Sequence, residues 1–305
     1  MPPILQWGLE LIAAIQKIHG PVLDRIALAF TTLGEEIFFL LLLPLIYWCF
    51  DPRLGVRVGI FFLISNYFNT GLKDLFRQPR PFDLVPSLRL APAEGYGLPS
   101  GHAQTAVIVW GSIAASLRKT WAWVGAVALM ALIGLSRIFL GVHFPTDVLA
   151  GWAIGGLLLG VFLSAQARAG ERLAGLRAGP LIVLALAASG LMLLVHATND
   201  TVTVSGTLGG FGTGLALASA NGYLAFDAGD KWGQRLLRFL VGTVFLFLIH
   251  FGLKILFPDE AARYYQVFRY VRYALVGVWV SYGAPWLFRR LRLVGGTAAG
   301  GLAAR

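Results

Sequence analysis

Long apolar segments recur along almost the whole chain, separated by short polar or charged stretches. Many of them reach the roughly 17 to 25 residues that an α-helix needs to cross the hydrocarbon core of a bilayer. Backbone groups in lipid must be satisfied within the segment itself, which favours helices. We predict an all-α integral membrane protein, a helical bundle of about nine spans. The expected spans are residues 35–50, 54–72, 101–117, 121–141, 147–166, 179–196, 206–226, 236–256 and 267–288.

The composition agrees with a membrane location. Only 13% of the 305 residues are charged and 57% are hydrophobic, whereas a soluble domain carries about 25% charged residues. The net charge of +10 would suit nucleic acid, but Lys and Arg lie mostly between the apolar segments and form no basic, aromatic-interleaved stripe. We therefore expect a bilayer and no nucleic acid as partner. The single cysteine, Cys49, excludes an intrachain disulfide and a multi-cysteine metal site.

The two ends of the chain differ from the spans. Apolar positions in residues 4–19 follow helical spacing beside a polar remainder, which predicts an amphipathic helix lying in the membrane interface. Residues 21–34 are expected to form a short helix before the first span. No cleaved signal peptide is expected. The Gly- and Ala-rich tail, 295–305, is expected to be flexible.

Small residues and aromatic residues in the spans predict contacts. Two small-xxx-small pairs, Gly151 with Gly155 and Gly156 with Gly160, indicate helix packing, as do the glycines of 209–214. Aromatic side chains near span ends are typical of interface anchors. These are Tyr47, Trp48, Trp121 and Trp123.

Charge orients the predicted spans. The larger share of Lys and Arg outside the motifs described below falls on one side, which is therefore predicted to be cytoplasmic. The N-terminus, the 73–99 loop and the 136–147 stretch then face outward. We expect an integral protein of a bacterial inner (plasma) membrane, with these segments on the periplasmic or exterior side.

Three short polar stretches lie on this outward side. The first runs from Lys73 to Pro81 and follows the second predicted span. Lys73 and Arg80 are seven residues apart, two helical turns, so a continuous helix would point both the same way. Pro79 and Pro81 are expected to end that helix.

The second stretch, Pro99-Ser100-Gly101-His102, opens the third predicted span. Ser100 is a favourable N-cap, and a helix N-terminus presents free N–H groups and a positive dipole end to an anion. Gly101 would let a ligand approach the backbone closely.

The third stretch contains Arg137, His143 and Asp147 within twelve apolar-flanked residues. Asp147 could hold one ring nitrogen of His143 and leave the other lone pair free to attack an electrophile. Arg137 could bind the resulting oxyanion. The alternative for Asp147 is an N-cap of the fifth span, and Lys73 and Arg80 could simply snorkel to the interface.

Together the three stretches supply three cations, a helix N-terminus, two histidines and one carboxylate. Two histidines and an aspartate could bind zinc or iron, but the three cations would repel a metal ion and attract an anion. We therefore expect no metal and no other cofactor. The set favours phosphoryl chemistry, in which stabilising the charged oxygens does most of the work.

In this order, Lys-x6-Arg-Pro, Pro-Ser-Gly-His and Ser-Arg-x5-His-x3-Asp resemble the type-2 phosphatidic acid phosphatase superfamily. The resemblance covers residues 35–166, and Gly-Glu-Glu-x-Phe-Phe from Gly34 is most similar to its sphingosine-phosphate phosphatase and glucose-6-phosphatase branch. It implies a six-helix-type phosphatase core at 35–166, with N-terminal helices at 1–34, extra C-terminal spans at 167–294 and the tail at 295–305. The matching residues are Lys73, Arg80, Pro81, Pro99, Ser100, Gly101, His102, Ser136, Arg137, His143 and Asp147.

The resemblance implies a metal-independent phosphatase that acts through a phosphohistidine. His143 would be the nucleophile, Asp147 would orient it, and His102 would be the general acid and then the base. The residues implied in phosphate binding are Lys73, Arg80, Ser100, Gly101 and Arg137.

The expected substrate is a lipid phosphate or diphosphate, because a site at the ends of spans meets lipid headgroups. Isoprenyl diphosphate, phosphatidate, phosphatidylglycerol phosphate and a sphingoid-base phosphate remain candidates. Hydrolysis of a soluble sugar phosphate and phosphotransfer between lipids are alternative activities. A lipid transporter or binding protein is the non-enzymatic alternative. The sequence carries no signal for an oligomeric state.

Overall fold

The computed structural model describes residues 1–174, 176–224 and 231–294, and these residues are helical with no strand among them. The all-α prediction is confirmed. The chain forms two compact units, of which the first comprises residues 1–40 and 64–167 and the second 41–63 and 168–305. The predicted flexible tail, 295–305, lies outside the described residues.

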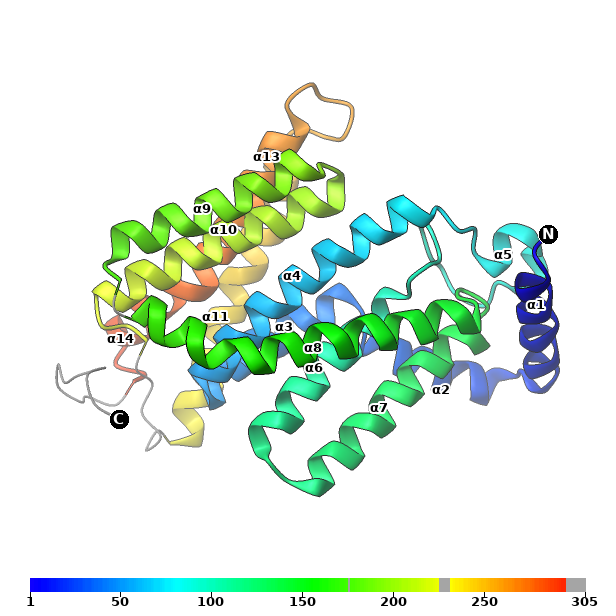
Figure 1. Cartoon of the computed structure of the whole chain (residues 1–305). Coiled ribbons are helices and arrows are strands. Elements are labelled where there is room, and N and C mark those ends of the chain that lie inside the picture. The colour runs from blue at the N-terminus through cyan, green and yellow to red at the C-terminus, as the bar shows by residue number, and fades with distance from the viewer. Residues whose placement is uncertain (175, 225–230, 295–305) are drawn as a thin grey trace. The chain divides into compact units, whose positions relative to one another are not determined.

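The first unit is built mainly from helices of the N-terminal half (Figure 1). Helices α3, α4 and α8 contain the boundaries between the units. The elements of residues 1–174, in chain order, are α1 (Pro3–Ile15), the 3₁₀ turn η1 (Gln16–Ile18), α2 (Pro21–Thr32), α3 (Glu36–Leu45), the π-helical turn η2 (Ile46–Phe50), α4 (Pro52–Phe76), α5 (Pro81–Leu84), the 3₁₀ turn η3 (Pro86–Leu88), α6 (Gly101–Leu117), α7 (Thr120–Phe139) and α8 (Pro145–Ala174).

The remaining helices belong to the second unit. They are α9 (Ala178–Val195), α10 (Asn199–Ala220), α11 (Trp232–Phe247), the π-helical turn η4 (Leu248–Gly252), α12 (Leu253–Leu256), α13 (Tyr265–Val278), the π-helical turn η5 (Trp279–Gly283) and α14 (Ala284–Arg290). Helix α10 packs against both α9 and α13, and α9 and α10 run side by side in green and yellow-green in Figure 1.

Within the residues that the structure describes, four helices are long and apolar enough to cross a membrane: Thr120–Phe139, Pro145–Gln166, Ala178–Val195 and Trp232–Leu256. A fifth span results if α2 and the helix Glu36–Phe50, which meet at a 51° bend, count as one. The protein is thus helical and membrane-embedded, with fewer candidate spans than the nine predicted. Two of the missing spans have a physical reason, because α6 has only 17 residues and α10 is rich in Gly, Ser and Thr.

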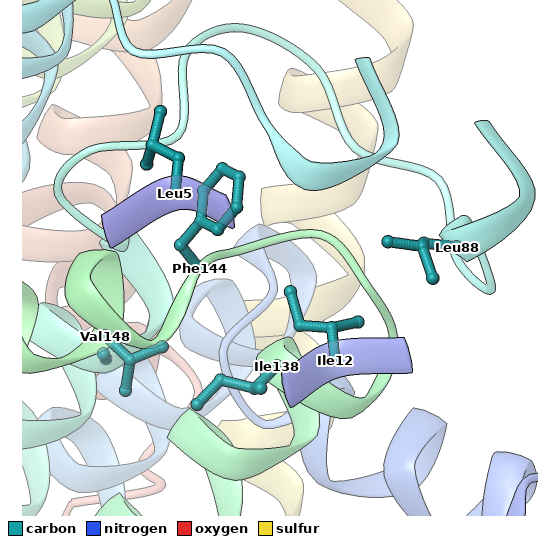
Figure 2. Close-up of a cluster of buried hydrophobic side chains, with 7 residues drawn as sticks. Leu5, Ile12, Leu88, Ile138, Phe144 and Val148 are labelled. Carbon is teal, nitrogen blue, oxygen red and sulfur yellow. The ribbon is translucent and has the colours of Figure 1, made fainter. Parts of the chain in front are cut away.

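Helix α1 packs its apolar face into the first unit. Leu5 and Ile12 are buried in one cluster with Phe144 and Val148, and Figure 2 shows Leu5 lying against the Phe144 ring. A Cβ atom on Gly8 would come within 2.6 Å of that ring. The apolar face that predicted an interfacial helix is therefore used inside the protein, where it supports the residue that follows His143.

The glycines of α8 divide into two faces. A Cβ on Gly151 would lie 2.6 Å from the Ser100 carbonyl, and one on Gly155 would lie 2.9 Å from that of Gln104. The predicted helix contact of this pair is confirmed, because the absence of side chains at Gly151 and Gly155 lets α8 approach α6 closely. The prediction for Gly156 and Gly160 is wrong, since among the described residues no atom lies within 4 Å of a Cβ built there.

Glycines also set the packing of the second unit. A Cβ on Gly210 or Gly214 would collide with α13 or η5, so the predicted packing role of 209–214 is confirmed. The prediction that Tyr47 and Trp48 are interface anchors is wrong. Both are buried in the second unit's core, where the Tyr47 hydroxyl and the Trp48 indole N–H donate to backbone carbonyls of η5.

Candidate active site

The first motif is not one continuous helix. Helix α4 ends at Phe76, and Arg77 follows with a left-handed backbone (φ 49°). The predicted two-turn alignment of Lys73 and Arg80 is therefore wrong. The residue before a proline is disfavoured in the α conformation, so Pro79 ends the helix earlier than expected. Lys73 lies in the last turn of α4, and Arg80 precedes the short helix α5.

The buried guanidinium of Arg80 holds several backbone segments together. Its Nε–H donates to the Gly95 carbonyl at 2.8 Å, and Nη2 donates to the Glu94 carbonyl at 2.7 Å. Nη1 donates to the Val142 carbonyl at 2.8 Å and lies 3.2 Å from Nε2 of His143. Arg80 is thus both a clamp on the 94–95 loop and a direct neighbour of the predicted nucleophile.

The tautomer of His143 follows from its two partners. A guanidinium only donates hydrogen bonds, so Nε2 of His143 must accept the one from Arg80. The neutral ring then carries its proton on Nδ1, which donates to Oδ2 of Asp147 at 3.2 Å. The ring is only 1% exposed. Its orientation is fixed by a cation on one side and a carboxylate on the other, with the lone pair on Nε2.

Asp147 is fully buried and satisfied from several directions. Oδ2 also accepts the backbone N–H of Phe144 at 2.9 Å, which fastens the start of α8. Oδ1 accepts Nε2–H of Gln78 at 2.6 Å. Asp147 therefore fastens the helix start and contacts His143, the two possibilities that the sequence left open. Gln78 was missed because a neutral amide inside the first motif gives no sign of its partner.

The electrostatics of the site keep His143 neutral. Burial, followed by the charges of Arg80, Arg137 and Lys73, holds the pKa of His143 well below its usual range. The three predicted cations therefore all act on this ring. A neutral imidazole offers a free lone pair at neutral pH, as a nucleophile requires.

The second motif begins α6 as predicted. The Ser100 hydroxyl accepts the Ala103 N–H at 3.5 Å, which confirms the N-cap. A Cβ on Gly101 would lie 3.1 Å from Oδ1 of Asn69. Asn69 in turn donates to Gln104 at 2.8 Å, in a buried contact that ties α4 to α6. The surroundings of Ser100 and Gly101 are thus protein groups that fix the start of the helix.

Arg137 contacts the last turn of α2, and His102 contacts the link between α2 and α3. Nη1 of Arg137 donates to the Thr31 hydroxyl, and its buried Nε–H has no hydrogen-bond partner among the described residues. Nε2 of His102 lies 3.4 Å from Oε1 of Glu35. Neither Thr31 nor Glu35 was assigned a role from sequence, since their partners are far away in the chain.

A metal cluster is not formed by the described parts of the chain, where no group of three His, Cys, Asp or Glu side chains could hold a metal ion. The unpartnered Nε–H of Arg137 is instead a donor that an anion would satisfy. A buried donor without a partner is costly and calls for such an explanation.

Two families match the chain. The family described as "PAP2 superfamily" matches residues 54–171. The family described as "PAP2 superfamily phosphatase, transmembrane extension" matches residues 202–298. The first match includes all three motifs, and the second falls in the second unit.

Three relatives illustrate the range of similar proteins. Lipid phosphate phosphatase delta of Arabidopsis thaliana is 30% identical over 52% of this chain and 42% of its own length. Sphingosine-1-phosphate phosphatase 1 of Mus musculus is 26% identical over 85% of this chain and 70% of its own. Phosphatidylglycerophosphatase B of Bacillus subtilis is 31% identical over 46% of this chain and 74% of its own. The chain thus spans less than half the length of the Arabidopsis relative.

Proposed function

Because the chain belongs to the PAP2 superfamily, as its three motifs predicted, we propose that it is a membrane phosphatase that hydrolyses a lipid phosphate or diphosphate through a phosphohistidine. The observation that carries this proposal is the fixed ring of His143, whose Nδ1–H binds Asp147 while its Nε2 lone pair faces Arg80. The guanidinium of Arg80 attracts phosphate, so the Nε2 lone pair of His143 points to the place where the phosphate would bind.

The reaction has two steps. Nε2 of His143 attacks phosphorus, the bond from phosphorus to the leaving oxygen breaks, and His102 gives that oxygen a proton. Asp147 stabilises the imidazolium character that develops on His143. In the second step His102 takes a proton from water, the water oxygen attacks phosphorus, and the bond to His143 breaks.

The cations act on the phosphoryl oxygens. Phosphate entering the site would take over the Nη1–H of Arg80 that now lies against His143, and it would satisfy the Nε–H of Arg137. Lys73 adds positive charge, and Ser100 and Gly101 provide the N-terminal end of α6. Such donors are preorganised for the charge that develops during transfer.

A lipid is the favoured substrate because the chain is an integral membrane protein and its relatives are named for lipid phosphates. We further propose the nine-span layout with the site on the outer face. Hydrolysis of a soluble sugar phosphate, phosphotransfer between lipids and lipid transport are the competing functions.

The test is phosphate release by the purified protein in detergent. The panel comprises phosphatidate, phosphatidylglycerol phosphate, sphingosine phosphate, an isoprenyl diphosphate and glucose 6-phosphate, each with and without a chelator. We expect release from at least one lipid, unaffected by the chelator and inhibited by vanadate. Release from the sugar phosphate alone, or from nothing on the panel, would contradict the proposal.

A further inference from the structure

Residues 31–35, which comprise the end of α2 and its link to α3, lie outside the stretch that matches the superfamily, which begins at residue 54. They nevertheless make three separate contacts with motif residues. Thr31 accepts a hydrogen bond from Arg137, Glu35 lies against Nε2 of His102, and Gly34 lies beneath the His102 ring. A segment that the three motifs do not include therefore forms part of the site.

Gly34 shows how tightly this turn is fitted. A Cβ built there would overlap the His102 ring, so a side chain at this position would displace either the ring or the turn. The close approach places the Glu35 carboxylate at 3.4 Å from Nε2 of the ring. The His102 side chain is 19% exposed and that of Glu35 is 52% exposed, so the pair lies at the edge of the protein rather than deep within it.

The charges around His102 explain why a carboxylate is needed there. The charged groups that act on its ring are Arg137 on α7, Lys73 on α4 and Glu35 on the α2–α3 turn. Two cations disfavour a protonated imidazole, whereas an anion favours it. A general acid must carry its proton when the leaving oxygen departs. Burial of the ring disfavours the protonated form most, Arg137 and Lys73 add to that effect, and Glu35 is the group that acts in the opposite direction.

The contact with His102 also affects the ionisation of Glu35. The hydrogen bond from His102 is the first cause that holds the pKa of Glu35 below its usual value. Because the interaction is shared by both groups, the Glu35 carboxylate favours the protonated ring of His102. Its hydrogen bond also assigns a proton to Nε2 and fixes the ring plane, which leaves Nδ1 to face the other way.

We propose that Glu35 is a positioning residue that orients His102 and favours its protonated form for acid catalysis, forming a second carboxylate–imidazole pair in addition to that of Asp147 and His143. This role rests on the proposed phosphatase function. The site would then have one pair for the nucleophile and one for proton transfer, and the second would be supplied by the N-terminal helices.

The first test is independent of turnover. Protein labelled with ¹⁵N-histidine is titrated in detergent, and the His102 signals are assigned with His102→Gln. In Glu35→Gln the His102 ring should titrate at lower pH than in the wild type. The matched control is Glu10→Gln, which removes an exposed carboxylate that accepts a hydrogen bond from Gln6 on α1 and should leave the titration unchanged. An unchanged His102 titration in Glu35→Gln would overturn the pairing.

The second test measures phosphate release. Glu35→Gln should lower kcat by roughly ten- to hundredfold, part of the 10²–10⁴-fold that acid–base catalysis supplies, with KM little changed. The alkaline limb of its pH profile should move to lower pH, and Glu35→Asp should recover part of kcat. Wild-type kcat with an unmoved limb would overturn the catalytic role. Absence of phosphate release from the wild type would instead refute the proposed function, while the titration would still decide the pairing.

Discussion

The contact between Gln78 and Asp147 yields the sharpest quantitative prediction. Asp147 is fully buried, and its Oδ1 accepts a 2.6 Å hydrogen bond from Gln78. The change Gln78→Met keeps the length of the side chain and removes the donor. A hydrogen bond to a charged group contributes about 1.5–3 kcal/mol. At about 1.36 kcal/mol per tenfold, kcat should fall by roughly 10- to 150-fold if the loss appears in the transition state.

The assay compares kcat and KM for the best substrate of the panel. KM should stay within about twofold, because Gln78 acts through Asp147 and does not hold phosphate. Gln6→Met, which changes an exposed glutamine of α1, is the control and should behave as wild type. In the double variant with Asp147→Asn, Gln78→Met should add little to the loss, because the two residues act as a unit. An unchanged kcat, or a loss that simply multiplies that of Asp147→Asn, would refute the reasoning.

Two further perturbations test the packing and the charge state of the site. Gly155→Ala should lower the unfolding temperature, because its Cβ would lie 2.9 Å from the Gln104 carbonyl and overpacking costs about 1–3 kcal/mol. The control is Gly156→Ala at the neighbouring position, where the added Cβ meets open space. This change should leave the unfolding temperature unchanged or raise it. The pKa of His143 is depressed in the folded protein, so its contribution to stability is present above its unfolded pKa of about 6.5 and is lost as the pH falls. The unfolding temperature should therefore change less between pH 7.5 and 5.5 in His143→Gln than in the wild type. An equal change in the two proteins would contradict this reasoning.

Much of the helical layout could be predicted from sequence because apolar length is a local property. The start of α6 at Ser100 and the pairing of His143 with Asp147 four residues later also follow from short-range geometry. Both are found in the structure. The roles assigned to these residues remain proposals, which the experiments above address.

Other features could not be predicted because they depend on partners distant in sequence. The spacing of Lys73 and Arg80 suggested one helix, but Pro79 and its effect on the preceding residue ended that helix at Phe76. Glu35 stood in the Gly-Glu-Glu-x-Phe-Phe stretch without an assigned role, and nothing local marked Gln78, since each is explained only by the partner that the fold brings to it. Trp48 resembled an interface anchor until its indole N–H was found bonded inside the second unit.

The account depends most directly on the covalent intermediate at His143. The purified protein should be mixed with a lipid substrate carrying a ³²P-phosphoryl group, quenched under alkaline conditions and digested, and the labelled peptide identified by mass spectrometry. We predict label on the peptide that contains His143 and none in His143→Ala. Label on another residue, or full phosphate release by His143→Ala, would contradict the account.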